Sequence, residues 1–320
     1  MQVTLAEAIA LLKRGELVAI PTETVYGLAA DASNEAAIRN IYMTKQRPAN
    51  NPLIVHISDI SQVDSWAAEF PPLAKKLAQA FWPGPLTLVL PAKNNVSTIV
   101  RAGEPTVALR VPNHPLTLQL LKKSGLSLAA PSANKYTQLS PTTAAHVANG
   151  LGDDVAVLDG GACKVGIEST IVGIEGDEWR LLRHGMITAA AIVAVAGKAA
   201  LVDDKQVPKV PGQHLLHYSP RTPMQLFNDR AALCVTADAL IKSHKTCAAL
   251  FIGEGANGAV PPIRPFIQLP FQPNQVAEQL YSALHQLDEM KVDKLLVELP
   301  PRTPEWAAVL DRLNRAGFQG

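Results

Sequence analysis

The hydrophobic residues at the start of the chain repeat at the spacing of a helix. Apolar side chains in segment 5–12 fall on one helical face, and Gly15 ends the pattern. Thr4 and Glu7 form the spacing of a capping box, in which the two side chains satisfy backbone N–H groups of the first helical turn. The sequence therefore predicts that an amphipathic helix opens the chain.

Short apolar runs alternate with helical patterns over the next 130 residues or so. The runs expected to form strands are 17–20, 53–57, 86–90, 107–111 and 126–130. Helical patterns lie between or after them at 35–43, 73–81, 115–123 and 142–149. Such alternation is typical of an α/β domain built on a sheet.

Three further apolar runs follow one another closely, at 155–158, 170–174 and 179–182. Connections this short favour antiparallel strands. We therefore expect these runs to be antiparallel additions to a mixed, twisted sheet, and we place the first domain at residues 1–196.

The periodic pattern stops between residues 197 and 223. Residues 202–223 contain four prolines and one glycine, and a connection of this length is either disordered or a functional lid. We interpret 197–223 as a linker that folds over a site. Beyond it, apolar runs at 224–227, 248–252 and 295–299 and a helical stripe at 276–287 predict a small α/β domain, 224–320.

Composition agrees with two folded domains. The chain has 320 residues, 48% of them apolar and 18% charged, which suffices for packed cores. No run of uncharged apolar residues is long enough to span a membrane, and the N-terminal segment does not resemble a secretory signal, so we expect a cytoplasmic protein. The three cysteines, Cys163, Cys234 and Cys247, are too few and too scattered for a disulfide framework, and we interpret them as small buried residues.

The charge balance argues against a protein that lives on nucleic acid. Lys and Arg number 29 against 28 Asp and Glu, a net charge of +1, and neither the first 196 residues nor the remainder is basic. A protein that neutralises many phosphates normally carries a basic face. Any positive charge that matters must be local.

Several familiar motifs are absent or misleading. The chain has no P-loop, no G-x-S-x-G and no H-E-x-x-H. Residues 253–258 read GEGANG, but two prolines follow closely where a dinucleotide-binding helix would have to begin, so we expect a surface loop. His214 and His217 have no further ligand nearby and are interpreted as linker contacts, not as a metal pair.

Polar residues concentrate in turns next to the predicted strands. The turn 21–27 contains two threonines and Glu23, and Lys45 and Arg47 stand two apart after a helix. In an extended segment such cations project to one side, where they either face solvent or hold an anion between them. Arg110 shares one face of an apolar strand with Thr106, so we expect it either to have an anionic partner or to line a cleft, and a carboxylate is its natural bidentate ligand.

Two more segments carry small hydrogen-bonding side chains. Ser132 and Asn134 follow a predicted strand, at a place where they suit a ribose, a base or a phosphate, whereas Ser140 is explained by helix capping alone. Ser169 and Arg183 lie near the ends of later strands, where α/β domains gather their sites.

Taken in order, the segments PTETVYGL, KQRPANNPLIVHI, TVALRVP, APSAN, SPT, GIESTIV and LLRHG resemble the signature series of the YrdC-like domain of threonylcarbamoyl-AMP synthases. The segment PGQHLLHYSP and the region after it resemble the long, two-domain form of that family. The resemblance implies a mixed-sheet YrdC-like domain followed by a smaller Rossmann-like α/β domain.

The resemblance also assigns site residues. The positions that match threonine contacts are Thr24, His56, Arg110, Ala130 and Ser169. The positions that match the nucleotide side are Lys45, Arg47, Asn51, Thr106, Ser132, Asn134, Ser140, Arg183 and Tyr218, with Lys45 and Arg47 as the catalytic cations.

The implied reaction joins L-threonine, bicarbonate and ATP into L-threonylcarbamoyladenylate and pyrophosphate, which makes the enzyme a nucleotidyltransferase. Mg²⁺ would accompany ATP, with no metal site made by protein alone, and the product would pass to a tRNA threonylcarbamoyl transferase that modifies adenosine 37. We expect neither stable nucleic-acid binding nor membrane attachment. The alternatives are an RNA-binding translation or ribosome-maturation factor, which the neutral charge disfavours, and a carbamoyl transferase of hydrogenase maturation, whose zinc-finger cysteine pairs are missing.

Overall fold

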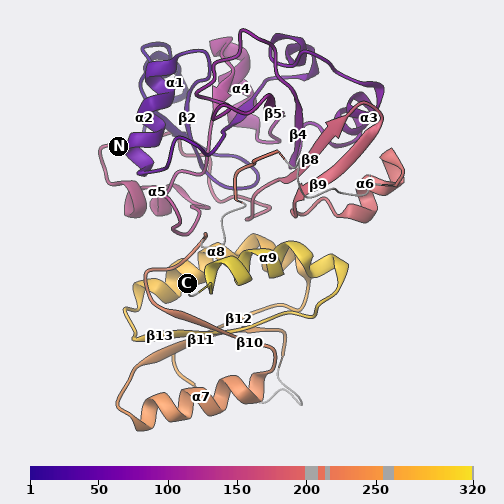
Figure 1. The fold of residues 1–320 in the computed structure, drawn as a ribbon. Coiled ribbons are helices and arrows are strands. Elements are labelled where there is room, and N and C mark those ends of the chain that lie inside the picture. The colour runs from indigo at the N-terminus through magenta and orange to yellow at the C-terminus, as the bar shows by residue number, and fades with distance from the viewer. Residues whose placement is uncertain (199–207, 213–216, 255–262, 319–320) are drawn as a thin grey trace. The chain divides into compact units, whose positions relative to one another are not determined.

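The computed structural model describes residues 1–198, 208–212, 217–254 and 263–318. Its contacts divide the chain into two compact units (Figure 1). The first comprises Met1–Tyr136, Pro141–Lys164 and Glu168–Gln213, and the second comprises Thr137–Ser140, Val165–Ile167 and His214–Gly320. The predicted linker is thus divided between the units, and its residues 199–207 and 213–216 lie outside the described part of the chain.

A nine-stranded mixed sheet forms the centre of the first unit, in the order β7-β1-β2-β6-β3-β5-β4-β8-β9. The strands are β1 (Val18–Ile20), β2 (Gly27–Asp31), β3 (Ile54–His56), β4 (Leu86–Pro91), β5 (Thr106–Arg110), β6 (Leu128–Ala129), β7 (Ala156–Val157), β8 (Thr170–Glu175) and β9 (Glu178–Arg183). The prediction of a mixed α/β sheet is therefore confirmed.

Helices cover this sheet. They are α1 (Leu5–Lys13), α2 (Glu35–Lys45), α3 (Pro72–Phe81), α4 (Pro115–Ser124), α5 (Ala144–Leu151) and α6 (Ala189–Ala196), with a 3-10 turn at Ile60–Ser65. The predicted capping box of α1 is present, because the Thr4 hydroxyl accepts from the Glu7 N–H and the Glu7 carboxylate accepts from the Thr4 N–H.

The two faces of the sheet are covered unequally. One face packs against buried side chains of α2, α3, α5 and α6 to form the largest core cluster. On the other face, α1 and α4 cover only the part built by β7, β1, β2 and β6. Over β3, β5, β4 and β8, no described helix contributes to the apolar cluster on that second face, whose described members are Ile54, Val89, Ala108, Ile171 and Val210. Val210 belongs to the predicted linker, so the described residues 208–212 supply cover where helices do not.

The second unit contains a parallel four-stranded sheet in the order β10-β13-β11-β12. Its strands are β10 (Met224–Phe227), β11 (Cys247–Ile252), β12 (Phe266–Leu269) and β13 (Lys294–Glu298). Helix α7 (Arg230–Lys242) lies on one side of this sheet, and α8 (Pro273–Glu289) and α9 (Ala307–Ala316) lie on the other, with a 3-10 turn at Pro304–Trp306 (Figure 1). This confirms the smaller α/β domain.

Some predicted details are wrong. Strand β7 is not an antiparallel addition next to β8 and β9, because it pairs in parallel with β1 at the opposite edge of the sheet. Strand β8 is parallel to β4, and only the β8–β9 pair is antiparallel as predicted. Cys163 and Cys247 are buried as expected, whereas Cys234 is only half-buried. Residues 255–258 of the GEGANG motif lie outside the described residues.

Candidate functional site

The turn 21–26 connects β1 to the antiparallel β2 and is held by one threonine. The Thr22 hydroxyl donates to the Val25 carbonyl at 2.6 Å and accepts from the N–H groups of Thr24 and Val25, both at 3.2 Å. This side chain replaces the hydrogen bonds that a regular turn would make. The Thr24 hydroxyl, 2.8 Å from that of Thr22, is thereby fixed in a buried position.

Side chains from neighbouring strands meet above the part of the sheet that lacks a helix. His56, Arg110, Thr87 and Ser169 each stand two residues from a member of the small apolar cluster on that face. Because side chains alternate along a strand, all four point to the same face as that cluster. His56 ends β3 and Arg110 ends the parallel strand β5, and these two residues are direct register partners.

Arg110 is the centre of this group. Its Nε donates to the Gly84 carbonyl at 3.2 Å, and its Nη1 donates to the Thr24 hydroxyl at 3.0 Å. Its Nη2 lies 2.7 Å from Oε1 of Glu23, and the two side chains are only 4% and 7% exposed. Glu23 thus supplies the anionic partner, which is one of the two surroundings that the sequence predicted for Arg110.

His56 is buried and uncharged beside this arginine. Burial, reinforced by the positive charge of Arg110, lowers the pKa of His56 to about 3. Its Nδ1 makes no hydrogen bond to any residue that the structure describes. A neutral imidazole with an unused ring nitrogen can accept or donate one hydrogen bond to a polar ligand, according to its tautomer.

Ser169 connects three strands. Its hydroxyl lies 2.7 Å from that of Thr87, on β4, and accepts from Nη2 of Arg183, at the end of β9, at 3.1 Å. Arg183 also donates from Nε to the Ser169 carbonyl and from Nη1 to the carbonyl of Pro211, both at 3.0 Å. The first unit's part of the linker is therefore attached to the site by a buried arginine.

A second cationic cluster lies at the end of α2. The Lys45 Nζ donates to the carbonyls of Ser132 and Asn134, both at 2.5 Å, and the residue is 1% exposed. Burial, reinforced by the charge of Arg47 and opposed by Glu168, holds the pKa of Lys45 well below its usual range. An anionic ligand here would restore the favourable charged form.

Lys45 and Arg47 do not share the extended segment that the sequence suggested. Lys45 is the last residue of α2, and Gln46 ends the helix in the left-handed region with φ 53°. Arg47 is 7% exposed, and its Nη2 donates to the Pro52 carbonyl at 3.1 Å. Both cations are thus buried, which excludes the alternative of a solvated face.

Close backbone approach brings the segment 130–134 to the turn. The Leu28 N–H donates to the Pro131 carbonyl at 2.7 Å, and the Ala133 N–H donates to the Tyr26 carbonyl at 2.8 Å. A Cβ on Gly27 would lie 3.0 Å from that of Ala130, so a side chain here would push the two segments apart. Glycine at position 27 allows the threonine turn to lie beside the segment that holds Lys45.

The predicted site residues fall into groups. Thr24, His56, Arg110 and Ser169 lie on or beside the sheet face over β3, β5, β4 and β8, and Ser132, Asn134 and Lys45 are joined by hydrogen bonds. Asn51 joins the latter group through Tyr136, because its Nδ2 donates to the Tyr136 hydroxyl at 3.0 Å and the Tyr136 N–H donates to the Lys45 carbonyl. Ala130 is buried and donates its N–H to Ile54.

Three predicted residues stand apart from these groups. Thr106 begins β5, at the other end of that strand from Arg110, and its register partner is Pro91. Ser140 and Tyr218 belong to the second unit. There Tyr218 is buried with φ 62°, and the guanidinium of Arg312 lies 5.0 Å from its ring centroid.

Sequence reasoning missed Thr87. Its hydroxyl contacts Ser169, and its place is fixed by the alternation of LTLVLP, in which Thr87 and Val89 share a face. That alternation was visible in the sequence. The pairing with Ser169 was not, because it depends on β4 lying beside β8.

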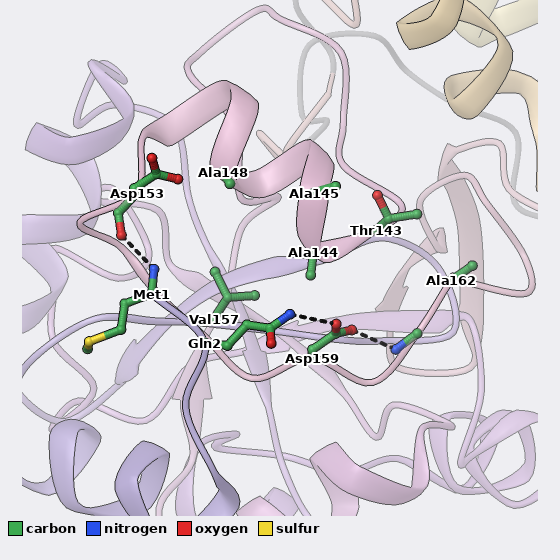
Figure 2. A pocket seen from close by; sticks show the side chains of 11 residues that line it. Met1, Gln2, Thr143, Ala144, Ala145, Ala148, Asp153, Val157, Asp159 and Ala162 are labelled. Carbon is green, nitrogen blue, oxygen red and sulfur yellow. Dashed lines mark hydrogen bonds between the residues drawn. The ribbon is translucent and has the colours of Figure 1, made fainter.

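A separate cavity of about 670 Å³ lies elsewhere in the first unit (Figure 2). Its lining includes Met1, Gln2 and Asp159 and the alanines at the start of α5, and none of the predicted site residues is among the described residues that line it. The Tyr26 hydroxyl donates to the Gly161 carbonyl at 2.8 Å and lies 3.1 Å from Asp159 Oδ1. This wall is therefore attached to the threonine turn, but the cavity itself is distinct from the site.

Two features are absent from the described residues. No three His, Cys, Asp or Glu side chains come together there as a group able to hold a metal ion. No helix in the described ranges is long and apolar enough to cross a membrane.

Comparison with known proteins covers nearly the whole chain. Residues 10–185 match the family model described as Telomere recombination, and residues 187–317 match the model described as Threonylcarbamoyl-AMP synthase, C-terminal domain. Threonylcarbamoyl-AMP synthase of Bacillus subtilis strain 168 is 41% identical over 98% of this chain and 92% of its own length. The synthase of Pyrococcus abyssi is 37% identical over 97% of this chain and 92% of its own length.

A solved structure has the same architecture. The crystal structure of P. abyssi Sua5 complexed with L-threonine superimposes with a TM-score of 0.90 and 33% identity, covering 99% of this chain and 97% of that one. An α/β fold with buried cations beside polar strand ends, together with relatives named as synthases, defines an enzyme. The chain belongs to the threonylcarbamoyl-AMP synthase family, in its two-domain form.

Proposed function

We propose that this enzyme makes L-threonylcarbamoyladenylate and pyrophosphate from L-threonine, bicarbonate and ATP. The observation that carries the proposal is the placement of buried Arg110, with Thr24 and His56, in the same unit as buried Lys45 and Arg47. One group suits an amino acid with a carboxylate and a hydroxyl, and the other suits a polyphosphate. The names of the relatives support the same reaction.

We assign the threonine half-site to Thr24, His56, Arg110, Ala130 and Ser169. Arg110 binds the substrate carboxylate through its Nη2 edge, which in the free enzyme faces Glu23. The unused Nδ1 of His56 and the hydroxyl of Ser169 offer hydrogen bonds to the remaining polar groups of the amino acid. That P. abyssi Sua5 has been crystallised with L-threonine supports an amino-acid site in this fold.

We assign the nucleotide half-site to a second set of residues. In the first unit it consists of Lys45, Arg47, Asn51, Thr106, Ser132, Asn134 and Arg183, whereas Ser140 and Tyr218 of the second unit are assigned by the family resemblance alone. Mg²⁺ would enter as part of the ATP complex, because this ion keeps most of its waters and binds mainly through substrate phosphates when few protein carboxylates are available. Among the described residues, Glu168 is the carboxylate whose charge raises the pKa of Lys45, against burial and Arg47, which lower it.

The chemistry is an adenylyl transfer, which makes the enzyme a nucleotidyltransferase. Threonine and bicarbonate first form N-carboxythreonine, a carbamate, whose new carboxylate attacks the α-phosphorus of ATP and expels pyrophosphate. No side-chain nucleophile is needed, so positioning and charge stabilisation supply the rate. Lys45 and Arg47 stabilise negative charge that grows on the leaving pyrophosphate. The product is then handed to a tRNA threonylcarbamoyl transferase in the cytoplasm.

Pyrophosphate release tests this proposal. Purified enzyme with ATP and Mg²⁺ should release pyrophosphate only when L-threonine and bicarbonate are both present, because the attacking carboxylate exists only after the two have combined. Each substrate omitted alone, in a CO₂-depleted buffer, should reduce the rate to background. Release that continues at the full rate without bicarbonate would contradict the proposal.

A further inference from the structure

The buried ion pair between Arg110 and Glu23 is incomplete on the side of the carboxylate. Neither Glu23 oxygen accepts a hydrogen bond from any residue that the structure describes, apart from the ion-pair contact at 2.7 Å between Oε1 and Arg110 Nη2. Buried carboxylates are normally surrounded by donors, because an unsatisfied buried charge is costly. Glu23 is therefore built to receive another donor.

The neighbouring acidic groups do not share this property. Asp159 accepts hydrogen bonds from the Gly161 N–H at 2.9 Å and from Gln2 Nε2 at 3.1 Å. Glu168 acts electrostatically on Lys45, in the cationic cluster at the end of α2. The charge of Glu23 instead raises the pKa values of His114 and Cys163, and Glu23 forms an ion pair with Arg110. It is therefore the carboxylate of the threonine half-site.

His56 is poorly suited to accept a proton from a substrate bound beside Arg110. Its pKa of about 3, caused first by burial and then by the charge of Arg110, means that a proton placed on this ring is strongly disfavoured near neutral pH. A proton leaving the substrate beside Arg110 therefore has Glu23 as its acceptor among the described side chains that surround this arginine.

We propose that Glu23 is a catalytic residue that binds the α-ammonium group of threonine and removes a proton from it; this assignment rests on the proposed function. An α-amino acid carries one carboxylate and one ammonium group close together. Its carboxylate can therefore pair with the arginine while its ammonium group pairs with the glutamate. The substrate carboxylate replaces Glu23 at Nη2 of Arg110, and the substrate ammonium supplies the donors that Glu23 lacks.

The ammonium group loses two protons, one before and one after the C–N bond forms. Glu23 takes one proton from the ammonium group, so the N–H electron pair stays on nitrogen and leaves a nucleophilic amine. Protonated Glu23 passes that proton to the hydroxyl of bicarbonate, which releases water and CO₂. The amine attacks the carbon of CO₂ to form the C–N bond, and its second proton leaves through Glu23 to solvent. The sum is threonine plus bicarbonate giving N-carboxythreonine, water and one proton.

The substitution Glu23→Gln separates this step from adenylyl transfer. It keeps the shape of the side chain but cannot take up a proton, so synthesis from threonine and bicarbonate should fall at least about a hundredfold. Formation of ATP from pyrophosphate and L-threonylcarbamoyladenylate needs no proton from the amine, and it should stay within about threefold of the wild type. Equal loss in both directions, or unchanged synthesis, would overturn the assignment.

The control is Glu298→Gln in the second unit, which removes the charge of a partly buried glutamate whose arginine partner lies 2.6 Å away. It should lower the melting temperature and leave the ratio of the two rates unchanged. A hundredfold change of that ratio in the control would overturn the assignment. If the wild type forms no ATP from the adenylate, the proposed function is wrong and this assignment falls with it.

A measurement on the wild type covers the case in which Glu23→Gln does not fold. Calorimetry compares L-threonine with 2,3-dihydroxybutyrate, which carries a hydroxyl in place of the amino group. Because Glu23 receives a charged donor from threonine alone, threonine should bind at least about tenfold more tightly. Equal affinity for the two compounds would show that no carboxylate contacts the amine.

Discussion

At the scale of single residues, the site depends on charges that the fold removes from water. Arg110, Glu23 and Lys45 are all buried, and burial of charge is costly even when the charges are paired. Such pairs contribute little to stability compared with well-packed apolar residues. The ligand binding that we propose for these residues would account for their presence.

His56 allows a test of burial through pH. Its folded pKa of about 3 lies below the unfolded value of 6.5, so the unfolded state binds the proton first as pH falls. The stability associated with a neutral His56 is therefore present above pH 6.5 and is lost as pH falls toward 3. Between pH 7 and pH 5 the wild type should lose about 2 kcal/mol more than His56→Gln in urea unfolding.

His114 and His285, whose pKa values burial also lowers, are present in both proteins and cancel in this comparison. Parallel pH dependences for the wild type and the variant would show that His56 is charged or solvated in the folded enzyme.

Arg110→Lys tests the division into half-sites. Lysine keeps the positive charge opposite Glu23 but loses the planar fork that binds a carboxylate through two hydrogen bonds. The apparent KM for threonine should rise at least about tenfold, whereas that for ATP should change less than about threefold. Steady-state kinetics with each substrate varied in turn provide the measurement. A larger effect on ATP would mean that the half-sites are exchanged.

How far these residues could be predicted depends on what fixes each one. The alternation of β5 was enough to predict that Arg110 has an anionic partner or lines a cleft, because that argument is local. The burial of Lys45 was not predictable in this way, since it depends on carbonyls of Ser132 and Asn134, which are far away in the sequence. The partner of Arg110 in the free enzyme, Glu23, was also out of reach, because it comes from a different turn.

At the scale of elements, the site lies where helices stop covering the sheet. Helices α1 and α4 pack over β7, β1, β2 and β6, and the neighbouring strands present His56, Thr87, Arg110 and Ser169 on the same face instead. Strand order thus decides which side chains meet. The edge of the sheet is formed by β9, whose last residue, Arg183, donates hydrogen bonds to Ser169, the residue before β8.

Gly185 should be essential for the close contact between the chain after β9 and residues 169–170. A Cβ at this position would lie 2.3 Å from the Thr170 nitrogen and 2.7 Å from the Ser169 carbonyl carbon, so the backbone must move. Gly185→Ala should therefore lower the free energy of unfolding by about 1–3 kcal/mol and reduce activity through displacement of Ser169. Chemical denaturation and pyrophosphate release measure the two effects.

Gly150→Ala is the matched control, because a Cβ there meets nothing within 4 Å. Position 150 lies in helix α5, where alanine should add up to about 1 kcal/mol of stability without changing activity. The same loss in both variants would mean that the close approach at Gly185 has no special importance.

Element prediction succeeded where apolar runs are long. It failed where a strand consists of small residues, or where its place depends on pairing with a strand far away in the sequence. Strand β2, Gly27–Asp31, was not predicted, because its glycine and alanines have little β propensity and its place depends on pairing with β1 and β6. Strand β12 and helix α6 were also missed. Strand β7 was recognised but misplaced, since the parallel pairing with β1 joins segments more than a hundred residues apart.

At the scale of the whole molecule, the motif series predicted the family and both domains. What a linear sequence could not show is that the compact units exchange segments. Residues 137–140 and 165–167 belong with the C-terminal unit, and the first unit extends to residue 213. The lid function of 197–223 remains a prediction. In the first unit the described part of this segment is 208–212. Val210 packs in the small apolar cluster there, and the Pro211 carbonyl accepts a hydrogen bond from Arg183.

The most direct test of the account follows one carbon atom. The enzyme is incubated with ATP, Mg²⁺, L-threonine and ¹³C-bicarbonate, and the adenylate product is analysed by mass spectrometry immediately after quenching. The account predicts a threonylcarbamoyl adenylate heavier by the single labelled carbon, because bicarbonate supplies the carbonyl that joins threonine to AMP. A product without the label, or threonyl adenylate that lacks the extra carbonyl, would contradict it.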